Sequence, residues 1–199
     1  VRDLKLNLSP YYLRPGFAFG GSCLPKEVRA VSHIAAGLGV SVPLVDSLMA
    51  TNQAHITQAV ELLKPFRGQR IGFLGVTFKA DTDDLRESPT LDLMAQLHNA
   101  GETVKAYDPN LHFGPMLQGQ IDYVRHAVPE QAKLMDGLQA MTVADAAMLV
   151  AQSDVVVVSH ATDEFRKAVR DRAPHVHVLD LARLFKELPD DANYQGIAW

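Results

Sequence analysis

A glycine-rich loop places the chain's one cysteine at the start of a predicted helix. Residues 16–27 read GFAFGGSCLPKE, so Cys23 follows two glycines and a serine, and Pro25 suits the first turn of a helix. A thiol at a helix N-terminus meets unpaired N–H groups and the positive end of the helix dipole, and Lys26 lies close by. These features favour the thiolate, which is the nucleophilic form of cysteine. The pattern therefore predicts a reactive thiol at Cys23.

The alternative is that Cys23 is an inert, buried small residue, which is the commoner role of a lone cysteine. The surrounding loop argues against this alternative. A buried structural cysteine needs neither two preceding glycines, which would let a ligand approach the backbone, nor a cap position with a lysine three residues on.

Composition bounds the classes of protein that need considering. The 199 residues are 47% hydrophobic and 21% charged, which is ordinary globular material for one large domain or one and a half. The formal net charge of −4 indicates no nucleic-acid surface, and no run approaches the roughly 18 apolar residues of a membrane span. One cysteine excludes an internal disulfide framework and a cysteine-cluster metal site. We expect a cytoplasmic protein and, because the chain opens on Val1 so close to the candidate site, one that begins in midstream.

The first third of the chain predicts two helices. One begins at Leu24 and ends before the glycines at 37 and 39, and a second covers residues 43–64 with a long apolar stripe. That stripe suits either packing on a partner helix or an intrachain core. Residues 65–69 then read as a linker. We therefore divide the chain into domains at 1–65 and 66–199.

The second domain alternates predicted strands with predicted helices. Short apolar runs at 70–76, 103–108, 154–159 and 176–180 read as strands, and the helices expected between them cover 90–100, 143–152 and 164–171. Such alternation indicates an α/β fold with a parallel sheet and right-handed crossovers, of Rossmann-like type. The segment from about 110 to 140 is expected to be irregular or partly helical.

This domain lacks the fingerprint of a dinucleotide site. Gly72 and Gly75 follow strand residues and Asp108 ends the next strand, but the G-x-G-x-x-G spacing is missing. A polar loop, residues 79–87, stands where small residues would open a helix. We therefore expect a Rossmann-type scaffold adapted to a different nucleotide.

Two long motifs resemble the UDP-glucose/GDP-mannose dehydrogenase family. Residues 9–26 (SPYYLRPGFAFGGSCLPK) are similar to the active-site segment of that family, and the YYLRPGFAF version is most like its GDP-mannose 6-dehydrogenase branch. Residues 75–89 (GVTFKADTDDLRESP) resemble the family motif at the start of its last domain, and the closing GIAW also looks like the mannose branch. The resemblance covers essentially the whole chain, but only the second half of the family.

The resemblance implies a set of site residues. The candidate substrate-binding residues are Tyr11, Tyr12, Arg14, Phe17, Phe19, Gly20 and Lys79. In the family, the arginine at the Arg14 position contacts the sugar-nucleotide site across a dimer interface. The residue at the Arg86 position helps to hold the phosphates or ribose of the cofactor. On spacing alone, Arg14 would be a solvated loop residue. Lys79 and Arg86 would equally be surface residues paired with nearby acidic side chains.

The implied chemistry is an oxidation of GDP-mannose to GDP-mannuronate with NAD as cofactor. Hydride transfer from the C6 alcohol makes an aldehyde, which Cys23 captures as a thiohemiacetal; a second hydride transfer gives a thioester, and water releases the acid. Glu27 occupies a position where the family usually has Asp, with a proposed role in orienting water or a catalytic lysine. The family also has an N-terminal NAD-binding domain that is missing here, so the chain is expected to be inactive alone and to form a homodimer or a higher homo-oligomer.

Two alternatives stay open at this point. The chain could belong to a UDP-glucose-type 6-dehydrogenase, or it could be a non-catalytic module for nucleotide-sugar binding or dimerisation. A pure binding module has no use for Cys23, which argues against the second. The eight histidines show no metal spacing beyond His175 and His177 on one strand, so we predict no metal site.

Overall fold

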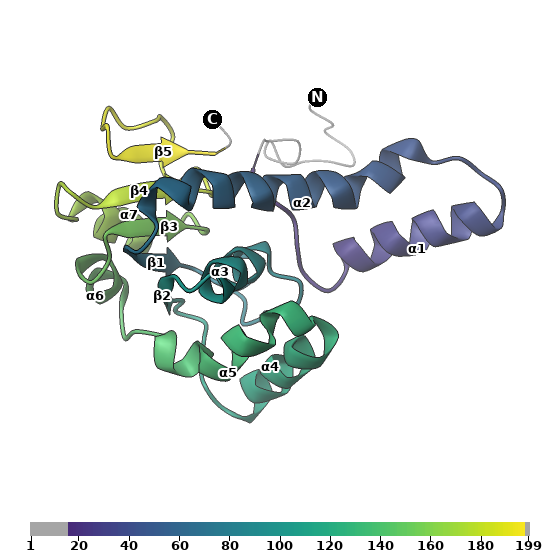
Figure 1. Ribbon diagram of the computed structural model, residues 1–199, viewed down its shortest axis with the longest axis horizontal. Helices are drawn as coiled ribbons and strands as arrows, with labels where there is room; N and C mark the ends of the chain where they lie inside the picture. The colour runs from purple at the N-terminus through teal and green to yellow at the C-terminus, as the bar shows by residue number, and fades with distance from the viewer. Residues whose placement is uncertain (1–15, 198–199) are drawn as a thin grey trace.

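The computed structural model describes residues 16–197, in which two helices lead into an α/β domain. Helices α1 (Leu24–Gly37) and α2 (Pro43–Leu63) form a hairpin whose turn projects away from the sheet (Figure 1). The second half of α2 lies against the α/β domain, where Ile56, Ala59 and Leu63 are buried. Both predicted helices are confirmed within a residue or two.

The α/β domain contains five strands and five further α-helices within the described residues. Its elements are η1 (Lys64–Phe66), β1 (Arg70–Leu74), α3 (Pro89–Asn99), β2 (Thr103–Tyr107), α4 (Pro115–Ala127), η2 (Pro129–Gln131), α5 (Ala132–Met141), α6 (Ala146–Ala151), β3 (Val155–Val158), α7 (Asp163–Arg170), β4 (His177–Asp180) and β5 (Tyr194–Gly196).

The sheet is parallel throughout, with strand order β2-β1-β3-β4-β5. This is a doubly wound order, in which the chain runs outward in opposite directions from β1 and β3. Ligands of such sheets bind outside the carboxyl ends of the strands at this switch point. The predicted α/β class with a parallel, Rossmann-like sheet is confirmed.

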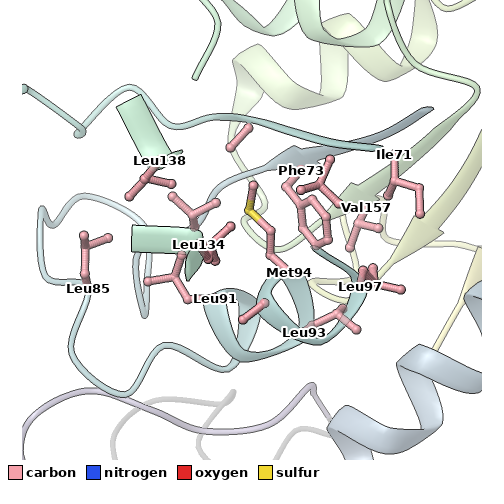
Figure 2. Packing of buried hydrophobic residues seen from close by; sticks show 14 of the residues in the cluster. Ile71, Phe73, Leu85, Leu91, Leu93, Met94, Leu97, Leu134, Leu138 and Val157 are labelled. Atoms are coloured by element: carbon pink, nitrogen blue, oxygen red, sulfur yellow. The ribbon is translucent and has the colours of Figure 1, made fainter. Parts of the chain in front are cut away.

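The side chains of the strands pack into two separate hydrophobic cores, one on each face of the sheet, because successive residues of a strand point to opposite faces. On one face, Ile71 and Phe73 of β1 pack with helices α2, α3, α4 and α5. Figure 2 shows Met94 of α3 between Phe73 and Leu134 in this layer. On the other face, the strands pack against α6 and α7. A sheet covered on both faces needs apolar runs, which is the pattern that identified the strands.

Capping side chains set where three of the helices begin. Ser88, Asp145 and Thr162 each accept a hydrogen bond from a backbone N–H in the first turn of α3, α6 and α7. The cap at Asp145 explains why α6 begins at Ala146 and not at residue 143, where the sequence pattern put its start. Serine, aspartate and threonine suit this position because their oxygens reach an unpaired amide.

Three features differ from the sequence-based expectations or go beyond them. The segment left as irregular or partly helical holds α4, η2 and α5. The short edge strand β5 has no counterpart among the expected strands. The apolar stripe of α2 serves the intrachain core in its second half, where Ile56 and Leu63 are buried, whereas Leu44 in its first turn is exposed.

None of the helices within residues 16–197 has the length and hydropathy needed to cross a membrane.

Candidate active site

The thiol of Cys23 lies at the N-terminus of α1, as predicted. Cys23 is the N-cap residue, Pro25 stands in the first turn, and the Cys23 side chain makes no capping hydrogen bond. The Cys23 residue is exposed, and its Sγ atom lies 3.8 Å from the Ser22 hydroxyl oxygen. Nothing in this geometry resembles a buried structural cysteine. The thiol is accessible beside the unpaired N–H groups of the first turn.

Two glycines let the cysteine loop pack directly on the loop that follows β1. Gly21 has φ +88°, and a Cβ atom built there would lie 2.7 Å from the Phe78 ring. A Cβ atom at Gly20 would lie 2.2 Å from the backbone carbonyl oxygen of Glu87. At both α-carbons the protein's own chain occupies the side where a Cβ atom would lie, so these glycines allow the two loops to approach closely.

A cavity of about 380 Å³ surrounds the thiol; we call it the Cys23 cavity. It draws residues from the cysteine loop, from α1, from the loop after β1 and from α4. Its lining residues are Ser22, Cys23, Lys26, Arg29, Arg86, Glu87 and Tyr123. The structure thus brings together two predicted site residues, Cys23 and Arg86, that are 63 positions apart in the sequence.

Ion pairs on the surface hold the cations of the Cys23 cavity. The Arg86 guanidinium donates to both carboxylate oxygens of Asp84, from Nε at 2.9 Å and from Nη2 at 2.8 Å. Arg29 makes a similar two-bond contact with Glu87, at 2.9 and 2.5 Å. These hydrogen bonds raise the pKa of each arginine further above its usual value. Arg86 is therefore paired with an acidic neighbour, which is what a surface residue without a function would show. It also lines the cavity that contains the thiol.

Glu27 lies beside Lys26 and does not line the Cys23 cavity. Lys26 Nζ is 3.0 Å from Glu27 Oε1, and both side chains are exposed. The hydrogen bond from Lys26 to Glu27 raises the pKa of Lys26, and the negative charges of Glu27 and Cys23 act in the same direction. Lys26 is thus a cation close to the thiol, and Glu27 is its acidic partner.

A second hollow, of about 330 Å³, opens at the carboxyl ends of β1, β3 and β4; we call it the strand-end crevice. It lies at the switch point of the sheet, where α/β folds bind ligands. Predicted site residues Phe17 and Lys79 both line it, together with His160. Lys79 is exposed, and its Nζ atom lies 5.4 Å from the centre of the Phe78 ring. The crevice combines one cation, aromatic surface and buried polar groups.

Phe19 is held in place by α2. The side chain of Asn52 accepts from the Phe19 amide at 2.7 Å and donates to the Phe19 carbonyl oxygen at 2.9 Å. This double hydrogen bond satisfies the backbone of the cysteine loop and fixes the loop on the helix. Phe19 lines neither the Cys23 cavity nor the strand-end crevice. Tyr11, Tyr12 and Arg14, the other predicted contacts, lie outside the described residues.

Buried polar residues at the strand ends were not among the predicted site residues. Asp108, which is 3% exposed, accepts hydrogen bonds from the amides of Val76 and Thr77 and from the Thr77 hydroxyl. In the sequence, Asp108 stands only as a candidate dinucleotide ligand whose glycine fingerprint is missing. Here its carboxylate is satisfied by the protein's own loop. His160, in the strand-end crevice, had no sequence signal beyond its place after a strand.

No group of three or more His, Cys, Asp or Glu side chains suited to a metal ion occurs in the part of the chain that the structure describes.

Models of one family match both parts of the chain. The UDP binding domain of the UDP-glucose/GDP-mannose dehydrogenase family matches residues 72–187. The central domain of the same family matches residues 2–54.

Individual relatives agree with this match. The GDP-mannose 6-dehydrogenase of Pseudomonas putida is 37% identical over 199 residues, which are 100% of this chain and 44% of the relative. The protein of that name from Pseudomonas aeruginosa is 37% identical over 198 residues. A UDP-glucose 6-dehydrogenase of Bacillus subtilis is 36% identical over 102 residues, 49% of this chain and 22% of that protein. The chain thus spans about 44% of the length of the GDP-mannose relatives.

Solved structures give the same result. A ternary complex of GDP-mannose dehydrogenase from Pseudomonas aeruginosa has a TM-score of 0.82 at 36% identity, covering 99% of this chain and 43% of that one. A UDP-glucose dehydrogenase from Pyrobaculum islandicum has a TM-score of 0.69 at 25% identity, covering 92% and 39%. Since two family models cover most of its length and relatives match it from end to end, the chain belongs to the UDP-glucose/GDP-mannose dehydrogenase family.

Proposed function

We propose that this chain forms the thiol-bearing and sugar-nucleotide-binding part of an NAD-dependent GDP-mannose 6-dehydrogenase, which oxidises GDP-mannose to GDP-mannuronate. The observation that carries the proposal is the Cys23 cavity. An exposed thiol at a helix N-terminus borders Lys26, Arg29 and Arg86 in a chain related along its length to GDP-mannose 6-dehydrogenases.

Cys23 is proposed to act as a nucleophile between two oxidations at C6 of the sugar. Its thiolate sulfur bonds to the aldehyde carbon while the carbonyl π electrons move to oxygen, which takes up a proton and gives a thiohemiacetal. The second oxidation leaves a thioester. Water then adds to the thioester carbon and the C–S bond breaks, which gives the carboxylate and returns the thiolate. One cysteine therefore serves both oxidations at one site.

The cations around Cys23 suit the phosphates of a dinucleotide. Lys26, Arg29 and Arg86 line one cavity with a single carboxylate, Glu87, so the lining carries net positive charge. Arg86 would hold a cofactor phosphate or ribose, because a guanidinium binds such oxygens with paired donors. Bound NAD would accept one hydride in each of the two oxidations. Glu27 is proposed to orient water or a catalytic lysine, although Lys26 is its partner in this structure.

The strand-end crevice is the proposed binding site for part of the sugar nucleotide. Lys79 offers a positive charge to a phosphate, and Phe17 offers apolar surface beside it. Phe19 and Gly20 are proposed contacts on the loop that joins this crevice to the thiol. Tyr11, Tyr12 and Arg14 complete the proposed set.

We also propose a division into a helical dimerisation part at 1–65 and a sugar-nucleotide domain at 66–199. The separate family matches at 2–54 and 72–187 support it. Exposed apolar residues on the helical hairpin, such as Ile34 at 60% and Leu44 at 76%, are consistent with a homodimer or higher homo-oligomer. Because the chain spans 44% of its relatives, we expect a separate domain to bind most of the NAD and the chain alone to be inactive. We expect the protein to work in the cytoplasm.

A UDP-sugar substrate is the second candidate. The family model that matches residues 72–187 is described as a UDP binding domain, and the Bacillus subtilis relative is named as a UDP-glucose 6-dehydrogenase. The mannose assignment instead depends on the relatives that match the whole chain. Base preference is therefore the property that separates the two candidates.

The test is NADH formation with GDP-mannose and UDP-glucose in parallel. The chain is joined at its N-terminus to the part of the Pseudomonas putida relative that it does not cover, and the same fusion with Cys23→Ser is the control. We expect two NADH per GDP-mannose, and a stalled or abolished reaction with Cys23→Ser. Faster turnover of UDP-glucose than of GDP-mannose would contradict the proposed substrate but leave the proposed mechanism in place. No NADH with either sugar nucleotide would favour a non-catalytic binding or dimerisation module.

A further inference from the structure

A buried polar cluster lies directly beneath the strand-end crevice. Thr77 follows β1, Asp108 follows β2 and His160 follows β3, so three neighbouring strands deliver one residue each to the switch point. The exposed fractions are 1% for Thr77, 3% for Asp108 and 6% for His160. Buried polar groups must find hydrogen-bond partners, and these residues find them in one another.

Asp108 fixes the backbone of the loop that follows β1. Its Oδ2 atom accepts from the amides of Val76 at 2.9 Å and Thr77 at 3.1 Å, and from the Thr77 hydroxyl at 2.9 Å. Its Oδ1 atom accepts from the Asn110 amide at 3.0 Å. A charged acceptor makes each of these hydrogen bonds stronger than one between neutral groups. The carboxylate therefore sets the path of residues 76 and 77.

His160 holds the carbonyl side of the same residue. Its Nε2 atom lies 3.0 Å from the Thr77 carbonyl oxygen, which can only accept, so Nε2 carries the proton. Nδ1 then has its lone pair toward Asp108 Oδ2, 3.9 Å away. Desolvation by burial lowers the pKa of His160 and outweighs the charge of Asp108, the hydrogen bond to Thr77 and the charge of Asp81, which all raise it, so the ring is neutral near pH 7.

The surroundings of His160 leave it little contact with a ligand. The Phe165 ring of α7 is parallel to the imidazole, with ring centres 6.5 Å apart. Gly75 has φ +90°, and a Cβ atom there would lie 2.5 Å from Nδ1, so the glycine makes room for the ring. The His160 side chain is 5% exposed. It is placed to shape the floor of the crevice rather than to bind within it.

Thr77 connects this cluster to Lys79. Its hydroxyl oxygen is 2.9 Å from Asp108 Oδ2 and also 3.0 Å from the Lys79 carbonyl oxygen. A hydroxyl has one proton, so the two acceptors share or compete for it. A shift of Thr77 therefore moves the backbone of Lys79, the cation of the crevice.

We infer that His160 and Asp108 are positioning residues that orient Lys79 toward an anionic ligand, a nucleoside diphosphate, by holding Thr77 from both sides. The inference deepens the proposed function and rests on its assignment of Lys79 to the sugar nucleotide. It concerns neither a direct contact of His160 with ligand nor a step of the chemistry.

The test compares two substitutions at His160 in the 199-residue chain. His160→Phe keeps a flat ring against Phe165 but removes the donor to Thr77, whereas the amide of His160→Gln can donate from the position of Nε2. His175→Phe, at an exposed position, is the matched control. The affinity for GDP is measured by calorimetry well below the melting temperature of each variant. Backbone and ring resonances are recorded by NMR without ligand.

We expect GDP to bind about tenfold more weakly to His160→Phe, since a buried carbonyl loses its donor, and within about twofold of the native affinity to His160→Gln. Without ligand, His160→Phe should speed amide exchange at Val76 and Thr77 and shift the Lys79 resonance, and the native ring should be protonated at Nε2. His175→Phe should change none of these. A residue that served stability alone would lower the melting temperature and leave affinity and the Lys79 resonance unchanged.

Failure of the inference and failure of the proposed function are distinguishable. If Lys79→Ala leaves the affinity for GDP unchanged, or if the native chain does not bind GDP, the proposed contact between Lys79 and the ligand is wrong. The His160 tautomer, the amide exchange at Val76 and Thr77 and the Lys79 resonance then still decide whether His160 positions Lys79. If Lys79→Ala weakens binding but His160→Phe does not, only the positioning role is wrong. An Nδ1-protonated ring at pH 7 would also overturn it.

Discussion

The Cys23 cavity and the strand-end crevice are built in opposite ways. The crevice rests on Asp108 and His160, which are 3% and 6% exposed and bond to the backbone of one loop. The cations of the Cys23 cavity are held by the pairs Arg86–Asp84 and Arg29–Glu87, whose arginine side chains are 44% and 51% exposed. One site is fixed by buried hydrogen bonds and the other by surface ion pairs.

This difference indicates which of the two sites has a shape that depends on the folded sheet. A buried hydrogen bond is costly to break, because the group left unpaired cannot turn to water. A surface ion pair contributes only about 0 to 1 kcal/mol, since water and salt screen it. The crevice should therefore keep its shape wherever the sheet is folded, while the side chains around Cys23 can rearrange when a ligand binds.

Removal of Asp108 should produce the largest effect. Asp108→Ala leaves two amides at the end of β1 without their acceptor and leaves the Thr77 hydroxyl with the Lys79 carbonyl alone, which should lower the free energy of unfolding by about 3 kcal/mol. The matched change in the Cys23 cavity is Arg86→Ala, which breaks the ion pair with Asp84 at an arginine that is 44% exposed and should cost less than about 1 kcal/mol. Urea denaturation of both variants measures the contrast. Equal losses would mean that the two sites do not differ in the way described.

Addition of a methyl group at Gly21 should have the next largest effect. Gly21→Ala combines a positive φ with a Cβ atom 2.7 Å from the Phe78 ring, so we expect a loss of about 2 kcal/mol in unfolding free energy. Gly39→Ala is the control, because Gly39 also has a positive φ but open space around it. It should cost about 1 kcal/mol. Thermal unfolding separates the backbone effect, common to both variants, from the loop packing found only at Gly21.

The same packing should govern the reactivity of the thiol. If Gly21→Ala pushes the cysteine loop off Phe78, the rate of Cys23 alkylation by iodoacetamide should change. In Gly39→Ala it should equal the native rate. An unchanged rate in both variants would show that the position of Cys23 does not depend on contact between the two loops.

Acidification should weaken the strand-end crevice through His160. Burial places the folded-state pKa of His160 below its ordinary value of 6.5, so the unfolded chain takes up the proton more readily. The contribution of the neutral ring is complete above pH 6.5 and declines as pH falls from there toward the folded-state pKa. Urea midpoints at pH 7.5 and 5.5 measure the decline. His160→Gln should show a smaller decline, because the other titrating groups are common to both proteins; an equal decline would contradict the prediction.

The strands β1, β3 and β4 could be predicted from the sequence because they are buried on both faces. Runs such as 71–76 and 155–158 carry the uninterrupted apolar pattern that a doubly covered strand requires. The strand β5 could not be predicted in this way. It has three residues, Tyr194–Gly196, and lies at the sheet edge, so no periodic pattern marks it. Its burial depends on contacts such as that between the Tyr194 hydroxyl and Asp180, 2.6 Å apart.

The candidate site was only partly readable for a related reason. The position of Cys23 at a helix start could be predicted because glycine, a cap position and proline are local signals. Tyr123 of α4 could not, since it borders the thiol only after α4 packs beside the loop that follows β1. His160 and Asp108 are likewise polar residues after strands, and only the strand order places them together. Site features that depend on adjacent residues can be predicted from the sequence, whereas contacts between residues far apart in the sequence cannot.

The pair Arg29–Glu87 should have the smallest effect. It links α1 to the loop after β1 through two hydrogen bonds, but 51% of the Arg29 side chain and 30% of the Glu87 side chain are exposed. A double-mutant cycle with Arg29→Ala and Glu87→Ala should give a coupling of about 0.5 to 1 kcal/mol in unfolding free energy, falling with added salt. A salt-insensitive coupling above about 2 kcal/mol would be that of a buried pair. The Cys23 cavity would then be as firmly built as the crevice, and the contrast between the two sites would be lost.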